Sequence, residues 1–314
     1  MRKIFILLAA SLLFAPASWG MKAVSKGAYK HVVIIGVDGG GNFFKDTYTP
    51  RCDEIFKNQA TTYRSKTSYP TISAQCWGSM LHGVLPEFHG LTNEIASSTP
   101  FPEDSPYPSI FRVVREAMPE AALASFVNWK AINKGIVEDN LGIVKDRGND
   151  LEVAGKIIKY LTSNIPTLLF VQFDSCDGAG HKNGYGSETH LSAISAIDAL
   201  IGSVYDHLKM KGILDETLFI VTADHGGTPT KEDGSVGGNH GGDTDAERYV
   251  FLGVAGKTVA KGTIEDAETR DIAAIAAYAL GIDCPETWTG HVPTGVFKGV
   301  KAGKRSEMET PDAG

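Results

Sequence analysis

The chain has 314 residues, of which 42% are hydrophobic and 21% are charged, and its formal net charge is −7. This composition is typical of a globular protein with a sizeable core, which excludes a disordered or fibrous chain. An acidic chain also lacks the broad basic surface that nucleic-acid binding requires, so no nucleic-acid partner is expected.

The first 20 residues have the pattern of a secretory signal peptide. Arg2 and Lys3 give a basic start, residues 4–15 are almost wholly apolar, and small residues follow. Such a segment is too short to span a bilayer comfortably. We therefore expect residues 1–20 to be removed and residues 21–314 to form one secreted or periplasmic domain with no stable membrane insertion. An uncleaved N-terminal anchor is the alternative.

Four apolar runs predict buried strands, at residues 31–37, 168–173, 218–222 and 249–254. Runs that are apolar throughout are typical of strands buried on both faces. Apolar residues at helical spacing follow the cap candidates Asn149 and Asp150 in one segment and Ser187 in another, and an alanine-rich helix over residues 271–280 ends at Gly281. Alternating strands and helices predict an α/β fold, with a mostly parallel sheet and helices on both faces.

Aspartate and histidine beside glycines recur after the apolar runs. The segments are Asp38-Gly-Gly-Gly, Asp177-Gly-Ala-Gly-His181, Asp224-His225-Gly-Gly and His240-Gly-Gly. Open parallel sheets bind their ligands outside the carboxyl ends of the strands, and each aspartate follows a predicted strand directly or closely. Carboxylate and imidazole are the groups that Zn²⁺ takes as ligands. Three aspartates and three histidines predict two metal ions, Zn²⁺ or another divalent cation.

A hydroxyl group that opens a helix is the candidate nucleophile. Ser73 is predicted to cap a helix that runs to about Leu81. Since free N–H groups and the helix dipole attract anions, backbone N–H groups near Ala74 are expected to hold a phosphoryl oxygen.

Taken together, these motifs resemble the alkaline phosphatase superfamily, and within it the type I phosphodiesterase/nucleotide pyrophosphatase branch. The matching segments, in the family's order, are Asp38, Pro70-Thr71-Ile72-Ser73, His82-Gly83, Pro86-Glu87-Phe88-His89-Gly90, Asp177 with His181, Asp224 with His225, and His240. The resemblance covers almost all of residues 31–297. It implies an alkaline-phosphatase-like core in a single catalytic domain.

The resemblance also implies a role for each residue. One zinc ion would be held by Asp38, Asp224, His225 and the Ser73 oxygen, and the other by Asp177, His181 and His240. The nucleophile would be Ser73, with Thr71 as the alternative. Asn93 resembles the asparagine that donates to a phosphate oxygen. Asp174 is either a partner of a metal ligand or a strand-end cap, and Lys130 is a candidate phosphate contact.

The predicted function is an exported zinc-dependent hydrolase of small phosphoric esters. A phosphodiesterase that acts through a phosphoseryl intermediate is favoured, with a phosphomonoesterase or phosphonate hydrolase as the alternative. A sulfatase is disfavoured because Gln75 and Trp77 stand where sulfatases carry proline and arginine, and a non-catalytic metal-binding domain is disfavoured by the complete ligand set. Only fourteen residues separate His225 from His240, where nucleotide pyrophosphatases usually carry a long insertion, so nucleotide specificity is not implied.

Four cysteines, Cys52, Cys76, Cys176 and Cys284, leave the disulfide pairing open.

Overall fold

A computed structural model describes residues 25–301, so the predicted signal peptide lies outside the described residues. One eight-stranded sheet crosses the molecule in the order β4-β3-β5-β1-β6-β7-β2-β8. Its strands are β1 His31–Val37, β2 Ala60–Lys66, β3 Leu123–Val127, β4 Val144–Arg147, β5 Leu168–Phe173, β6 Thr217–Ala223, β7 Tyr249–Ala255 and β8 Gly262–Thr263. Among these described strands only β7 runs antiparallel to its neighbours. The predicted α/β class and mostly parallel sheet are confirmed.

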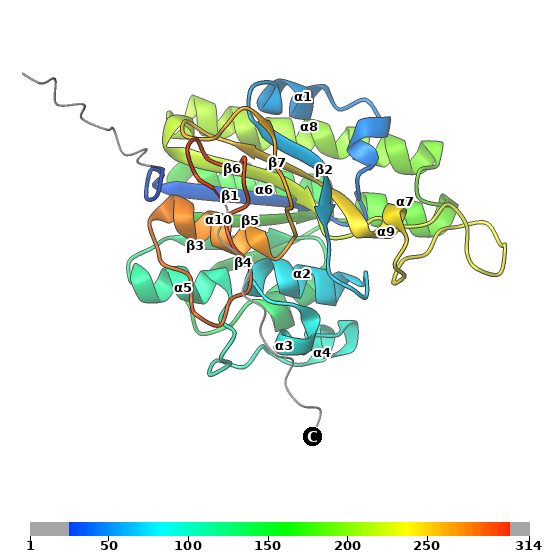
Figure 1. Cartoon of the computed structure of the whole chain (residues 1–314), viewed down its shortest axis with the longest axis horizontal. Helices are drawn as coiled ribbons and strands as arrows, with labels where there is room; N and C mark the ends of the chain where they lie inside the picture. The colour runs from blue at the N-terminus through cyan, green and yellow to red at the C-terminus, as the bar shows by residue number, and fades with distance from the viewer. Residues whose placement is uncertain (1–24, 302–314) are drawn as a thin grey trace, which may run out of the picture.

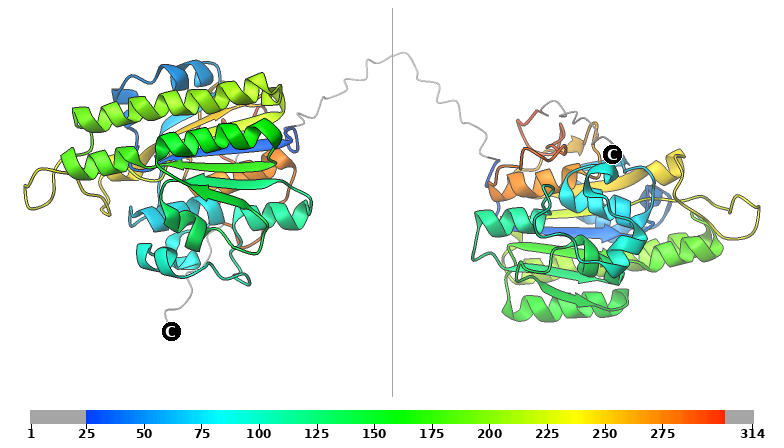
Figure 2. Two further views of the ribbon diagram at one scale, coloured as in Figure 1. Left: turned by 180° about the vertical axis from the view of Figure 1, so that it is seen from behind. Right: turned by 90° about the horizontal axis from the view of Figure 1, so that it is seen from below.

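Helices cover both faces of the sheet (Figures 1 and 2). The helices are α1 Pro50–Phe56, α2 Ser73–His82, α3 Pro86–His89, α4 Asn93–Ser98, α5 Ile110–Ala117, α6 Asp150–Ser163, α7 Ser175–Asn183, α8 Glu188–Met210, α9 Asp245–Arg248 and α10 Asp271–Leu280. Short helical segments also lie at Phe43–Asp46, Ile132–Ile136 and Leu214–Glu216. Helices α1, α6 and α8 pack on one face, and α2, α5 and α10 pack on the other.

The alternation of side chains along β1 explains why the sheet needs both layers. Val32 and Ile34 belong to the core beneath α2 and α10, whereas Val33, Ile35 and Val37 belong to the core beneath α6 and α8. Successive side chains of a strand point to opposite faces, so a strand that is apolar throughout must be covered twice.

The predicted helix ends are also observed. Asn149 caps α6 in a capping box with Glu152, and Ser187 caps α8 by accepting from the His190 N–H. Gly281 ends α10 with a φ of 82°, a left-handed conformation that favours glycine.

Within residues 25–301, each helix is too short or too polar to span a lipid bilayer. All four cysteines are free thiols, so none of the disulfide pairings left open by the sequence forms.

A buried neutral histidine below the sheet predicts acid sensitivity. His89 ends α3, its Nδ1 accepts from the Leu91 N–H at 3.1 Å, and its Nε2 lies 3.2 Å from the Ser79 hydroxyl. Burial, and secondarily the nearby His82, lower the pKa of His89 from 6.5 to about 3. Between pH 6.5 and about 3, His89 therefore binds a proton in the unfolded chain but not in the folded chain, and stability is lost as the pH falls through this range.

We expect this histidine to add a slope of about 1.4 kcal/mol per pH unit to the free energy of unfolding across that window. The His89→Gln variant, which cannot titrate, should show the shallower slope in urea denaturation at pH 4.5 to 6.5, even if its stability is lower throughout. Identical slopes for the two proteins would show that His89 is protonated without cost.

Candidate metal centre

Three neighbouring strands end at the same level of the sheet. Val37 of β1 pairs with Phe173 of β5 on one side and with Ala223 of β6 on the other. The next residue of each strand is an aspartate: Asp38, Asp174 and Asp224. In-register strand ends therefore bring these carboxylates to one edge, as parallel topology predicts.

Asp38, Asp224, His225 and Ser73 form one group of ligand atoms, which we call the Ser73 cluster. His225 Nε2 lies 3.5 Å from Asp38 Oδ1 and 3.2 Å from Asp224 Oδ2. Ser73 Oγ lies 3.3 Å from the same nitrogen. All four side chains are buried.

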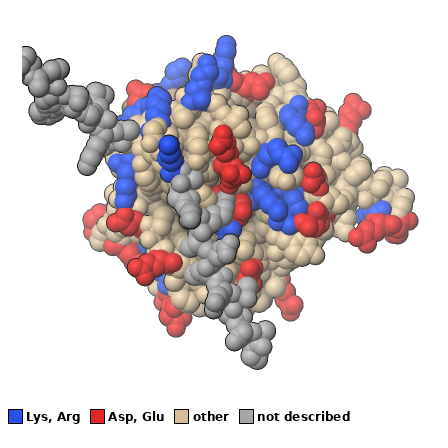
Figure 3. All heavy atoms as spheres, viewed as in Figure 1, with Lys and Arg blue, Asp and Glu red and all other residues tan. Residues whose placement is uncertain are grey.

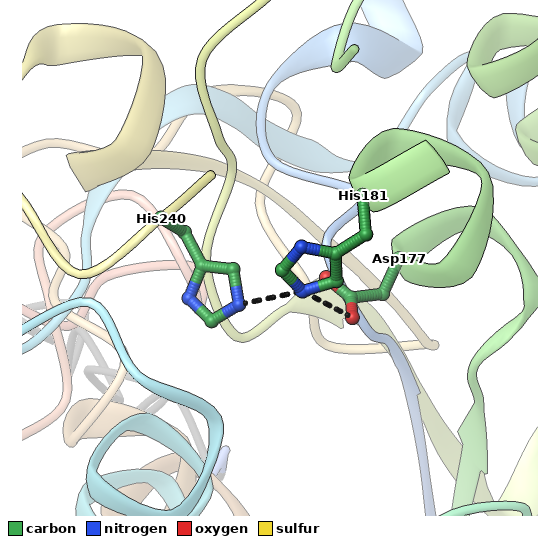
Figure 4. Close-up of side chains that lie close together, drawn as sticks. All are labelled: Asp177, His181 and His240. Carbon is green, nitrogen blue, oxygen red and sulfur yellow. Dashed lines mark hydrogen bonds and ion pairs between the residues drawn. The ribbon is translucent and has the colours of Figure 1, made fainter. Parts of the chain in front are cut away.

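Asp177, His181 and His240 form a second group, the His240 cluster (Figure 4). His181 Nε2 lies 3.3 Å from Asp177 Oδ2 and 3.1 Å from His240 Nε2. The His225 and His240 rings stack with centroids 3.9 Å apart, so the two clusters adjoin. Asp177 and His181 occupy successive turns of α7, where residues four apart share one helix face.

The Ser73 cluster has the donor chemistry of a divalent-cation site. One oxygen of each carboxylate is fixed: Trp77 and Gln172 donate to Asp38 Oδ2, and two backbone N–H groups donate to Asp224 Oδ1. The other oxygens, Asp38 Oδ1 and Asp224 Oδ2, are buried without a hydrogen-bond partner. A buried carboxylate oxygen with no partner is costly, and a divalent cation would satisfy both.

The ionisation of these groups points the same way. Burial raises the pKa of Asp38 well above its usual range, and the nearby Asp224 carboxylate raises it further. Burial and the Asp177 carboxylate likewise raise the pKa of Asp224. Close negative charges that destabilise one another in this way are stabilised by a bound cation.

Two of the three imidazoles, those of His225 and His240, present Nε2 to the site. His225 Nδ1 lies 2.9 Å from the Gly226 carbonyl oxygen, and His240 Nδ1 lies 2.7 Å from the Thr71 carbonyl oxygen. Each Nδ1–H therefore donates to the backbone and leaves Nε2 free as a ligand. Burial lowers the pKa of His225, and burial together with His225 lowers that of His240 to about 4, which favours the neutral form that metals require.

The structure separates the two candidate hydroxyls. Ser73 Oγ lies in the Ser73 cluster, whereas the Thr71 hydroxyl accepts from the Gly241 N–H and donates to the Gly242 carbonyl, both at 2.8 Å. Thr71 is therefore committed to the loop that carries His240.

One expectation about the start of helix α2 is wrong. Ser73 is the first residue of the helix rather than its cap; Ile72 occupies the cap position, and no side chain caps this end. The Ala74 N–H does not face the site free, because it donates to Asn93 Oδ1 at 2.9 Å. Because this bond occupies the amide oxygen of Asn93, its NH₂ group is the part of the side chain that can donate a hydrogen bond to a ligand.

A cavity of about 200 Å³ opens over the two clusters. It is lined by Asp38, Ser73, Asn93, Trp129, Asp174, Asp177, His181 and His240. Burial raises the pKa of Asp174 to about 6. Gln172 Nε2 donates both to Asp174 Oδ1, at 2.9 Å, and to Asp38 Oδ2, so Asp174 is linked to a candidate metal ligand through a shared donor. Lys130 is exposed and does not line the cavity; the neighbouring Trp129 does.

Gln172, Trp77 and Tyr185 hold the ligands in place but were not predicted as site residues. Gln172 Nε2 reaches Asp38, while its Oε1 accepts from the N–H groups of Asn128 and Trp129. A glutamine inside an apolar strand run was the available signal. Trp77 fits because Gly36 lacks a side chain: a Cβ there would lie 2.3 Å from the indole.

Comparison with known proteins identifies the family. The model of the type I phosphodiesterase / nucleotide pyrophosphatase family matches residues 115–277, more than half of the chain. The chain belongs to this family. The matched range includes the His240 cluster and the Asp224-His225 pair, whereas Asp38 and Ser73 precede it.

The curated relatives of this family member have low sequence identity to it. Ectonucleotide pyrophosphatase/phosphodiesterase family member 7 from Rattus norvegicus is 21% identical over 251 residues, which is 73% of this chain and 57% of that protein. A 2,3-bisphosphoglycerate-independent phosphoglycerate mutase from Clostridium beijerinckii is 30% identical over 139 residues, which is 44% of this chain and 26% of that protein. The chain thus spans only about half the length of the ectonucleotide relative.

Solved structures share the fold. Murine ectonucleotide pyrophosphatase / phosphodiesterase 5 has a TM-score of 0.67 at 17% identity and covers 84% of this chain and 97% of its own. A phosphonate monoester hydrolase from Silicibacter pomeroyi has a TM-score of 0.63 at 14% identity, with 83% and 75% covered. The alkaline-phosphatase-like architecture expected from the motifs is confirmed.

Proposed function

We propose that this protein is an exported zinc-dependent hydrolase of small phosphate diesters, with Ser73 as its nucleophile. The observation that carries the proposal is the position of Ser73 Oγ. It lies 3.3 Å from His225 Nε2, a nitrogen that is itself within 3.5 Å of two carboxylate oxygens without hydrogen-bond partners. A lone hydroxyl among metal-ligand atoms is the arrangement of an activated nucleophile.

The residues present fit two divalent cations. The Ser73 cluster would hold one ion and the His240 cluster the other. Bound there, the metal ions would lower the pKa of the serine hydroxyl and of a water molecule and would draw in an anionic ester. Three carboxylates and the ionised serine oxygen together balance the charge of two divalent cations.

The chain's own groups then support a two-step displacement. Ser73 Oγ, which has already lost its proton, forms a bond to phosphorus while the ester bond to one alcohol breaks, and the departing alkoxide takes up a proton from solvent. Water next attacks phosphorus and the bond from phosphorus to Ser73 Oγ breaks. One water proton is lost to solvent, a phosphate monoester is released and the ionised serine is regenerated. Asn93 would donate its NH₂ to a phosphoryl oxygen; in support, its side chain lines the cavity and its Oδ1 accepts from the Ala74 N–H.

The charge around the cavity favours diesters over monoesters. A diester carries one negative charge and a monoester two. Within residues 25–301, no lysine or arginine lines the cavity, and Asp174 adds a carboxyl group. The extra cation that would favour a monoester, for which Lys130 was the candidate, is therefore not provided by the lining.

Export and the substrate class rest on supporting observations of a different kind. The signal-like residues 1–20 favour a secreted or periplasmic location. One matching structure is an inactive variant of murine ectonucleotide pyrophosphatase / phosphodiesterase 5 in complex with AMP, which agrees with a small phosphate ester as substrate.

We test the function with the purified protein, its metal content and a panel of esters. About two zinc ions per chain are expected by elemental analysis. The value of kcat/KM for bis-p-nitrophenyl phosphate should exceed that for p-nitrophenyl phosphate by about tenfold or more, because the lining supplies no cation for a second charge. A higher value for the monoester, a phosphonate ester or p-nitrophenyl sulfate would replace the diesterase with that activity. A protein that binds no metal and cleaves none of them would remove the proposal altogether.

A further inference from the structure

Tyr185 is a buried residue that contacts every member of the His240 cluster. It follows α7, and its side chain is only 1% exposed. Its hydroxyl donates to Asp177 Oδ1 at 2.5 Å, whereas Asp177 Oδ2 is the oxygen that faces His181. The phenol thus fixes one carboxylate oxygen and leaves the other free to act as a ligand.

The ring of Tyr185 also packs against both histidines. Its centroid lies 5.8 Å from that of His181 and 6.3 Å from that of His240, and both contacts are edge-on. On a third side the ring meets His190, at 5.2 Å. One side chain therefore restrains a carboxylate and two imidazoles that come from different segments of the chain.

Three glycines make room for this ring. A Cβ at Gly180, Gly227 or Gly238 would lie 2.4 to 2.5 Å from Tyr185 ring atoms, closer than real side-chain contacts allow. These glycines belong to α7 and to both ends of the loop that leads to His240. The segments that supply the ligands therefore also supply the glycines that leave space for the Tyr185 ring.

We propose that Tyr185 is the positioning residue of the His240 cluster, orienting Asp177, His181 and His240 for a divalent cation. This inference rests on the proposed function, because it assigns a metal to that cluster. Tyr185 touches ligands rather than reacting atoms, and it acts by fixing the ligand geometry before the cation binds. Groups that orient metal ligands in this way typically change metal affinity by 10- to 100-fold when they are removed.

The Tyr185→Phe variant tests the hydrogen bond, because it keeps the ring and removes only the hydroxyl. In zinc-buffered solutions we expect one of the two zinc sites to weaken by 10- to 100-fold while the other keeps its affinity. The visible absorption spectrum of the Co²⁺-substituted protein should change in the bands of that one site. At saturating zinc, kcat should fall with little change in KM. Tyr160→Phe is the matched control, since Tyr160 is half-buried against Phe126 and its hydroxyl bonds to no other described residue.

A pair of glycine substitutions in α7 tests whether the space left for the Tyr185 ring is needed for metal binding. In Gly180→Ala the atoms nearest to the new methyl group belong to the Tyr185 ring, the closest at 2.5 Å, whereas in Gly178→Ala it meets nothing within 4 Å. The first variant should lose zinc affinity at the same site as Tyr185→Phe. The second should bind both ions normally, and its melting temperature should be equal or slightly higher, because alanine favours the helix.

The outcomes separate the two proposals. Wild-type protein with two zinc ions and diesterase activity, combined with a Tyr185→Phe variant of unchanged zinc affinity and Co²⁺ spectrum, would overturn the role of Tyr185 alone. A variant that only melts at a lower temperature, with both affinities intact, would also overturn it. Wild-type protein that binds no zinc would overturn both proposals.

Discussion

Replacing Ser73 with alanine is expected to lower kcat/KM for a phosphate diester by on the order of 10⁴-fold or more, with both metal ions still bound. The reason is that the reaction then lacks the oxygen that attacks phosphorus, while Asp38, Asp224 and His225 remain as ligands. Activity is measured by steady-state hydrolysis of bis-p-nitrophenyl phosphate, and metal content by elemental analysis of the same samples.

Ser79→Ala is the matched control for that variant. Ser79 is another buried serine of α2, and its hydroxyl contacts His89 rather than the cavity. Its loss should change stability more than kcat. Rapid acid quenching of the wild-type reaction, followed by peptide sequencing in a mass spectrometer, should place the phosphoryl group on Ser73. A phosphoryl group on Thr71, or full activity in Ser73→Ala, would reject Ser73 as the nucleophile.

Removing the metal ions should abolish hydrolysis and lower the melting temperature by about 10 °C or more. A ligand present at about 1,000 times its Kd stabilises the folded state by about 4 kcal/mol, and each kcal/mol corresponds to a few degrees in a protein of this size. The effect should be large because Asp38 Oδ1 and Asp224 Oδ2 then stay buried without a partner. Calorimetry before and after chelation, and again after zinc is restored, measures it.

The Asp224→Asn variant separates metal binding from the stability of the metal-free protein. The amide keeps the shape of the carboxylate and removes one of the crowded negative charges, so the metal-free variant should melt at or above the temperature of the metal-free wild type. It should also bind less zinc, respond less to chelation and lose activity. A variant that retains full zinc affinity would show that Asp224 is not a ligand.

The sequence predicts the central strands well for a physical reason. β1 and β5 have the expected bounds because a strand buried on both faces is apolar at every position, and such a run has sharp ends. Strand β2, which lies between β7 and β8, was not predicted. Its residues Ala60–Lys66 alternate between buried and exposed positions and include threonine, arginine and lysine, so the signal is weak.

The candidate ligands were predictable because each is adjacent in the sequence to a glycine or to the end of a strand. Their partners were not, since they depend on contacts between distant segments. Gln172 and Asp38 are 134 positions apart, and nothing near Tyr185 in the sequence indicates that it contacts His240. The error at Ser73 has a similar origin: a serine at a helix start suggests a cap, but here tertiary contact with His225 takes the hydroxyl.

The small volume above the metal centre has a consequence for selectivity. A hollow of about 200 Å³ can enclose a phosphoryl group and little more, whereas sites that recognise whole organic ligands are usually larger. Both alcohol portions of a substrate would then project into solvent. We therefore expect catalytic rates to depend strongly on the acidity of the leaving alcohol and only weakly on its shape, so that the enzyme would cleave many different esters.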